Sequence, residues 1–180
     1  MSQFEEKQIE REEIFDGAVL HVVKDKILLP NGNTSYREFC LHKGAAAVIP
    51  ITENNEAILV RQFRYAHHRE FLEIPAGKFD FVGEQPLDAA KRELREETGA
   101  SAEKYTSLGI LDTTPALIDE VIHIFMAEGL TYGEMHPDDD EFLSVERIPL
   151  TTLVDMVMSG KIRDGKTQIA ILKAAKIKGI

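Results

Sequence analysis

Residues 83–100, GEQPLDAAKRELREETGA, are the stretch of sequence that decides the fold. A proline near its start and Gly99 near its end predict a helix from Pro86 to Thr98. Apolar residues recur along this helix at helical spacing, at Leu87, Ala90 and Leu94. We therefore expect the helix to pack one face against a core.

The same helix carries three carboxylates, Glu93, Glu96 and Glu97, within about 100° of one another on its surface. One interpretation is a solvated charged face, in which Arg92 and Arg95 partly offset the repulsion. The other is a set of hard oxygen ligands for Mg²⁺ or Mn²⁺, ions that neutralise phosphate oxygens and activate a bound water. The residues alone leave both interpretations open.

The whole chain is acidic and has the composition of an ordinary globular protein. Its 180 residues suit one domain, or one domain with a small appendage, and its formal net charge is −10. This charge argues against a general nucleic-acid binder, and an acidic protein acting on phosphates would need divalent cations. The single cysteine, Cys40, excludes an internal disulfide, and the charged first residues lack the apolar core of a signal peptide. We expect a cytoplasmic protein.

Strand-like and helix-like segments alternate along the chain. The first 43 residues are predicted to be β-rich, with two strand-like runs around the turn PNGN at 30–33. The runs 45–51 and 56–63 flank TENN and predict a second hairpin. Further strands are expected at 70–77, 105–112, 120–127 and 142–148, and helices at 150–159 and 166–178. This pattern predicts α/β or α+β layers around one sheet.

The segment SGKIRDGKTQ at 159–168 matches the phosphate-binding pattern G-x-x-x-x-G-K-[ST] letter for letter. A working loop of this kind follows a strand, whereas the residues before Gly160 have helical spacing. Only 13 residues follow Thr167, too few for another crossover and strand. We interpret the segment as a joint between two helices, with Asp164 or Thr167 capping the second.

The stretch 83–100 resembles the Nudix box, the signature of the Nudix hydrolase family, G-x5-E-x7-R-E-U-x-E-E-x-G-U with U aliphatic. The matching positions are Glu84, Arg92-Glu93-Leu94, Glu96-Glu97 and Gly99-Ala100, while six residues rather than five separate Gly77 from Glu84. The segments LVRQFR, EIPAGK and SGKIRDGKT, and Pro115 fifteen residues after Ala100, are similar to one branch of the family. That branch cleaves ADP-ribose and related nucleoside diphosphate sugars.

The resemblance covers roughly residues 35–175 and implies a fold of mixed α/β (α+β) class. In this Nudix fold a mixed β-sheet is sandwiched between helices, here in residues 44–180. Residues 1–43 would form a small N-terminal β region that helps to build a homodimer.

The resemblance also implies a metal site. Glu93 and Glu97, together with the main-chain carbonyl of Ala76, would bind Mg²⁺ or Mn²⁺, and Glu96 would be a ligand or act through a bound water. Arg92 would pair with Glu84 or a neighbouring carboxylate, so that the remaining motif residues are structural: Gly77, Glu84, Arg92 and Gly99.

The attacking water would be activated by an acidic residue of the loop 138–141, with Glu141 as the first choice and Asp140 as the second; a solvated acidic turn would look the same. Arg37 and Arg64 are candidates for holding the diphosphate or the terminal ribose, because guanidinium groups suit phosphate oxygens. Glu73 could meet a ribose hydroxyl or the base. All three residues could equally be surface charges.

Together these features predict a metal-dependent pyrophosphohydrolase that converts ADP-ribose into AMP and ribose 5-phosphate. The partner is a small molecule, with no nucleic acid or membrane involved. Other enzymatic possibilities are GDP-mannose, a dinucleoside polyphosphate or an RNA 5′ end as substrate. Two alternatives are not Nudix hydrolases: a non-catalytic ligand-sensing module, and a nucleotide phosphotransferase that uses the segment 159–168.

Overall fold

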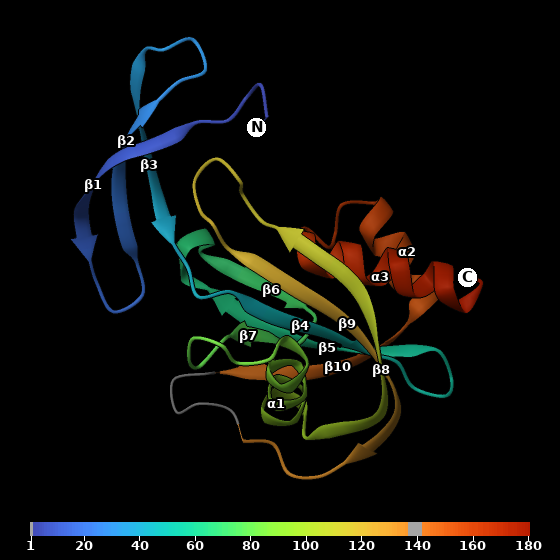
Figure 1. The fold of residues 1–180 in the computed structure, drawn as a ribbon. Helices are drawn as coiled ribbons and strands as arrows, with labels where there is room; N and C mark the ends of the chain where they lie inside the picture. Colours follow the sequence, from blue (N-terminus) through green and yellow to red (C-terminus); the bar gives the residue numbers. More distant parts are fainter. Residues whose placement is uncertain (1, 137–141) are drawn as a thin grey trace. The chain divides into compact units, whose positions relative to one another are not determined.

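A computed structural model describes residues 2–136 and 142–180 (Figure 1). The contacts within the chain divide it into two units. The first comprises Met1–Lys43 and Asp112–Val121, and the second comprises Gly44–Leu111 and Ile122–Ile180. Across the described residues, no helix combines the length and the apolar character that crossing a lipid bilayer requires.

The first unit is built on an antiparallel sheet of strand order β1-β2-β3. Its strands are β1 (Lys7–Asp16), β2 (His21–Leu28) and β3 (Thr34–Leu41), and the expected turn lies between the last two. Strand β1 was not predicted from the sequence, because its many charged residues show no regular alternation of apolar and polar side chains. Every residue of β1 is exposed, and backbone pairing with β2 and an ion pair from Arg11 to the buried Asp25 (2.7 Å) hold the strand.

The second unit contains two sheets. One has the order β7-β4-β9-β8, and β4 and β9 run parallel in it. Its strands are β4 (Ala45–Pro50), β7 (Ala76–Lys78), β8 (Ala100–Asp112) and β9 (Val121–Tyr132). The other sheet has the order β10-β5-β6 and consists of β5 (Glu56–Arg64), β6 (Arg69–Glu73) and β10 (Leu143–Pro149).

The hairpin predicted from 45–51 and 56–63 is wrong. Strands β4 and β5 lie in different sheets and are joined only by an isolated bridge between Ile51 and Ala57. The reason is the apolar character of β4, all six of whose residues are buried. Such a strand is central in its sheet. Here β7 and β9 occupy both of its edges, so β5 pairs elsewhere.

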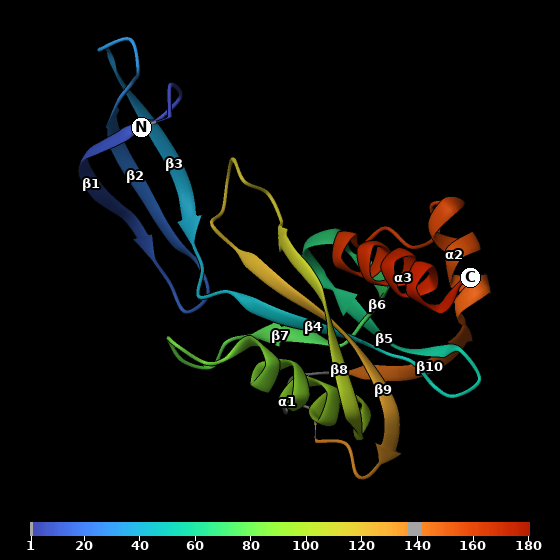
Figure 2. The ribbon, with the colours of Figure 1, turned by 45° about the vertical axis from the view of Figure 1, so that its right-hand side comes forward.

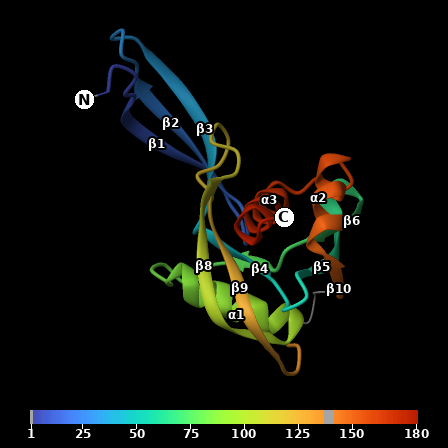
Figure 3. The same cartoon turned by 90° about the vertical axis from the view of Figure 1, so that its right-hand side faces the viewer.

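Helices cover both faces of β4 (Figures 2 and 3). Alternate residues of the strand point to opposite faces, so Ala46 and Val48 pack with α1 (Pro86–Thr98). Ala47 and Ile49 belong to the larger core, which also contains residues of α2 (Leu150–Met158) and α3 (Gly165–Lys178). The predicted mixed α/β class, with a sheet between helices, is confirmed.

The helix boundaries follow their local signals. Helix α1 spans the predicted residues, and Gly99 ends it in the left-handed conformation (φ 67°), with its N–H donating to the Arg95 carbonyl. The segment 159–168 is a joint between α2 and α3, as predicted. Asp164 caps α3 by accepting a hydrogen bond from the Thr167 N–H at 2.9 Å.

Candidate active site

The carboxylates of α1 divide between the interior and the surface. Glu93 and Glu97 are only 8% and 4% exposed, whereas 37% of the Glu96 side chain is exposed. Glu93 and Glu97 lie one helical turn apart on the same face of the helix. Two buried like charges at this spacing do not fit a solvated charged face, which was the alternative interpretation of the helix.

Arg92 pairs with several of the neighbouring carboxylates. Its Nη1 donates to Glu93 Oε1 at 2.6 Å and to Glu96 Oε2 at 3.1 Å. Its Nε lies 3.4 Å from Glu84 Oε1, the partner that the family motif implies, and 3.2 Å from Asp80 Oδ2. Burial alone would lower the pKa of Arg92, but the charges and hydrogen bonds of these carboxylates outweigh it and raise that pKa further above its ordinary value. Arg92 therefore stays charged and fixes this end of the helix face.

Strand β7 brings the chain backbone up to Glu93. A Cβ placed on Gly77 would have all three atoms of the Glu93 carboxyl group within 2.6 Å. Only glycine at this position therefore allows the Glu93 carboxylate to lie where it does. Ala76, the residue whose carbonyl is a predicted metal ligand, is half-buried beside Gly77 and pairs with Ala47 of β4. The carboxylate face of α1 is thus closed on one side by β7.

This donor set fits a divalent cation. Buried carboxylate oxygens are the hard ligands that Mg²⁺ and Mn²⁺ prefer, and a cation beside Glu93 and Glu97 would offset their mutual repulsion. In residues 2–136 and 142–180, no three His, Cys, Asp or Glu side chains gather closely enough to hold a metal by themselves. A third ligand would therefore come from a backbone carbonyl such as that of Ala76, from water or from substrate.

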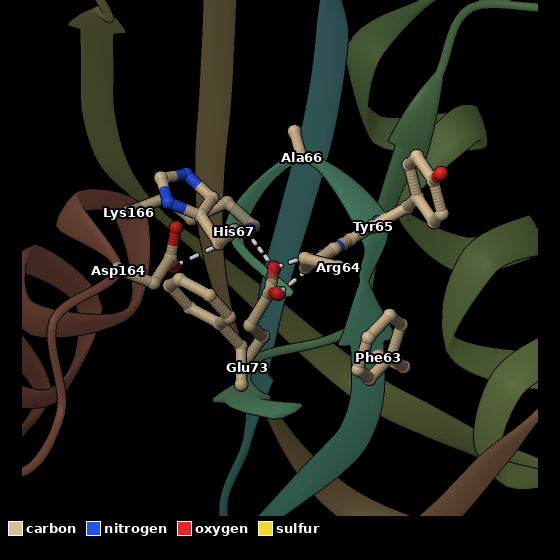
Figure 4. Close-up of a pocket in the computed structure, with 9 residues that line it drawn as sticks. Phe63, Arg64, Tyr65, Ala66, His67, Glu73, Asp164 and Lys166 are labelled. Carbon is tan, nitrogen blue, oxygen red and sulfur yellow. Dashed lines mark hydrogen bonds and ion pairs between the residues drawn. The ribbon is translucent and has the colours of Figure 1, made fainter. Parts of the chain in front are cut away.

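A cavity of about 430 Å³ lies at the end of β5 (Figure 4). Its wall is formed by the end of β5, the short 3₁₀ helix η1 (Tyr65–His67), strand β6 and the residues just before and within the first turn of α3. The lining residues are Phe63, Arg64, Tyr65, Ala66, His67, Phe71, Glu73, Asp164 and Lys166. A second cavity of about 600 Å³ shares His67, Phe71 and Asp164 with the first, and Arg69 and Arg163 extend its wall.

Two cations hold Glu73 at the wall of the first cavity (Figure 4). Arg64 donates to its carboxylate through Nε at 2.7 Å and Nη2 at 2.9 Å, and Lys166 Nζ also donates to it. Burial alone would raise the pKa of Glu73, which is 3% exposed. The hydrogen bonds and charges of Arg64 and Lys166 outweigh burial and lower this pKa to about 2. Glu73 is therefore a fixed, ionised acceptor on the cavity wall.

Arg64 also connects this cavity with the carboxylates of α1. Its pKa is raised above the ordinary value, first by the hydrogen bonds to Glu73 and also by the negative charge of Glu97. Its side chain is 42% exposed, and Nη1 makes no hydrogen bond to the residues that the structure describes. Arg64 and Glu73, both predicted as substrate-binding residues, thus lie together, and the carboxylate face of α1 is within electrostatic reach.

Arg37, the third residue predicted to bind substrate, belongs to β3 in the first unit, where its Nε donates to Glu6 Oε2 at 3.0 Å. Glu141 and Asp140, the candidates for the general base, lie outside the described residues.

The part of the cavity wall that α3 contributes was not predicted from the sequence. The Gly165-Lys166-Thr167 segment was expected only to join two helices, yet Asp164 and Lys166 line the cavity. No local pattern connects Lys166 with Glu73, which precedes it by 93 residues. The aromatic and basic residues that cluster in FRYAHHR, at 63–69, are a local signal that points to this part of the cavity wall.

Comparisons with known proteins agree with this geometry. A family model described as the NUDIX domain matches residues 41–168. The chain is 42% identical over 173 residues to the ADP-ribose pyrophosphatase of Bacillus subtilis (strain 168), covering 95% of this chain and 93% of the relative. It is also 42% identical over 170 residues to the methanol dehydrogenase activator of Bacillus methanolicus, covering 93% and 91% respectively.

A solved structure, described as the crystal structure of ADP compounds hydrolase, has the same fold. It superposes with a TM-score of 0.85 at 23% identity, over 99% of this chain and 97% of the other. The match of the family model over most of the chain shows that this protein belongs to the Nudix family.

Proposed function

We propose that the protein is a metal-dependent pyrophosphohydrolase of nucleoside diphosphate sugars, with ADP-ribose as its preferred substrate. The observation that carries this proposal is the burial of Glu93 and Glu97 on the face of α1 that β7 closes, within electrostatic reach of Arg64. Membership of the Nudix family and the 42% identity to an ADP-ribose pyrophosphatase support it.

In this proposal Glu93 and Glu97, with the carbonyl of Ala76, hold Mg²⁺ or Mn²⁺. The bound ion would neutralise part of the diphosphate charge and would lower the pKa of the attacking water. Glu96, which Arg92 holds at the exposed edge of the face, supports the site as a further ligand or through a bound water.

The chain's own residues bind and orient the substrate. Arg64 donates from Nη1 to the diphosphate, and Glu73 accepts from the hydroxyls of a ribose in the cavity. The oxygen of water forms a bond to one phosphorus while the bridging P–O bond breaks, so that ADP-ribose gives AMP and ribose 5-phosphate. The proton of the water passes to a carboxylate, for which Glu141 and then Asp140 remain the proposed general bases.

The decisive experiment compares the wild type with Glu97→Gln on a panel of nucleoside diphosphate sugars in the presence of Mg²⁺ or Mn²⁺. We expect the wild type to hydrolyse ADP-ribose and the variant to lose at least about a hundredfold in kcat/KM. The control is Glu53→Gln at an exposed position, which should keep full activity. If no member of the panel is hydrolysed by the wild type, the proposed function is wrong, and near-normal activity of Glu97→Gln would remove the metal assignment.

The same panel separates the remaining Nudix substrates. Faster turnover of GDP-mannose or of a dinucleoside polyphosphate than of ADP-ribose would change the substrate while leaving the metal site in place. A capped RNA 5′ end is disfavoured by the net charge of −10.

The relative that is named a methanol dehydrogenase activator supports a second candidate function. Because its identity to this chain is also 42%, the protein could act by raising the activity of a dehydrogenase. Adding the wild type and Glu97→Gln to a methanol dehydrogenase tests this. An increase with both proteins would point to activation by contact, and an increase with the wild type alone would point to activation by hydrolysis.

The proposal includes a homodimer formed through the first unit. Three large apolar residues of β1, Ile9, Ile14 and Phe15, are each more than half exposed, and a second subunit would cover them. Light scattering on the wild type and on Phe15→Asp tests the dimer, which the substitution should weaken. We also retain a cytoplasmic location, which the free thiol of Cys40 supports.

A further inference from the structure

The Gly165-Lys166-Thr167 segment is fastened to the end of β6 by two adjacent contacts. The buried hydroxyl of Thr167 accepts a hydrogen bond from the Ile74 N–H at 3.0 Å. One residue earlier in each segment, Lys166 donates to Glu73. Asp164 pairs with Lys166 at 3.1 Å and also caps the helix. The start of α3 therefore has a defined place at the wall of the cavity.

The two cations that hold Glu73 differ in their exposure. The Lys166 side chain is 11% exposed, and its Nζ pairs with both Glu73 and Asp164, whereas the Arg64 side chain is 42% exposed. Because two carboxylates already engage its Nζ, Lys166 has less freedom than Arg64 to bind a ligand. Arg64 is the cation that the cavity presents, and it binds Glu73 through Nε and Nη2, so that the position of Glu73 sets the position of the guanidinium.

The charged Arg, Lys, Asp and Glu side chains that line this cavity balance only when Lys166 is present. Arg64 of β5 and Lys166 of α3 are positive, while Glu73 and Asp164 are negative; His67 of η1 also lines the cavity. Glu97 of α1 adds a negative charge that Arg64 senses. Without Lys166, the cavity would carry an uncompensated negative charge and would repel a diphosphate.

We propose that Lys166 is a positioning residue for the hydrolysis of nucleoside diphosphate sugars: it holds Glu73 so that Arg64 faces the diphosphate, and it keeps the cavity from repelling an anionic substrate. This inference rests on the proposed function. It assigns a role to the segment that resembles a phosphate-binding loop, but the role is exerted through Glu73 and not by contact with a phosphate.

The test is a comparison of KM and kcat for ADP-ribose in Lys166→Met, Lys166→Arg and Thr167→Val. Lys166→Met removes the charge and should raise KM about tenfold, since hydrogen bonds to charged groups are lost, while kcat stays within about threefold. Lys166→Arg keeps the charge and should recover most of the affinity. If Lys166→Met does not fold, Lys166→Gln takes its place with the same expectation.

Thr167→Val is the matched control for a purely structural role. It removes the hydrogen bond to Ile74 without changing a charge, so that it should lower the melting temperature and raise KM much less than Lys166→Met does. The inference is overturned if Lys166→Met leaves KM within twofold, or if Thr167→Val raises KM equally. Absence of turnover in the wild type would instead overturn the proposed function, so the two failures are distinguishable.

Discussion

Replacing Gly77 with alanine should reduce the activity of the site while leaving the protein folded. The added Cβ would have the whole Glu93 carboxyl group within 2.6 Å, whereas ordinary contact begins at 3.4 Å. Because a backbone strand moves less easily than the end of a side chain, Glu93 has to retreat by roughly 1 Å or more and to loosen its 2.6 Å hydrogen bond to Arg92.

Displacing a catalytic group by about 1 Å can cost about a hundredfold in rate, and overpacking costs about 1–3 kcal/mol in stability. We therefore expect Gly77→Ala to remain folded and to lose about a hundredfold in kcat/KM for ADP-ribose. The assay follows AMP release in the presence of Mg²⁺, alongside a thermal melt.

The control is Gly133→Ala, where the nearest heavy atom to a new Cβ is 3.7 Å away. This variant should keep both its activity and its melting temperature. Activity of Gly77→Ala within about twofold of the wild type would refute the reasoning, because the site would then tolerate displacement of Glu93 from its place beside β7.

Three further predictions follow from charges in the second unit. Arg92→Lys keeps one charge but cannot reach the surrounding carboxylates together, so urea unfolding should show a loss of about 2 kcal/mol; an unchanged midpoint would contradict this. Because the folded pKa of Glu73 lies at about 2, below its ordinary 4.5, its stabilisation is present above pH 4.5 and is lost as the pH falls towards 2. Between pH 5 and pH 3 the wild type should lose about 2 kcal/mol more than Glu73→Gln, and parallel curves would exclude this role. Chelation with EDTA should abolish turnover, Mg²⁺ or Mn²⁺ should restore it, and full activity in EDTA would remove the metal from the mechanism.

Local signals in the sequence predicted the helices well. Proline at the first position and glycine after the last position set both ends of α1, because each residue imposes its own backbone conformation. Asp164 or Thr167 was predicted to cap α3 for the same reason, and Asp164 is the residue that does so. These features depend on neighbours within a few residues, which the sequence displays directly.

Features that depend on contacts between residues far apart in the chain could not be predicted from the sequence. The charged strand β1 is stabilised by its pairing with β2. Strand β4 does not form the expected hairpin with β5, because β7 and β9 pair with both of its edges. In the site, the ion pair between Glu73 and Lys166 spans 93 residues and has no local pattern. The Nudix resemblance pointed to the carboxylates of α1, but only the structure shows which of them are buried.

The hydrogen bond between Ile74 and Thr167 has a consequence for the order of folding. It closes a span of 93 residues, and contacts of such long range form after local helices and hairpins because chain entropy opposes them. We therefore expect the wall of the cavity to be among the last parts of the molecule to form. A partly folded chain that already has α1 would carry the carboxylates proposed to bind the metal without the cavity proposed to bind the sugar.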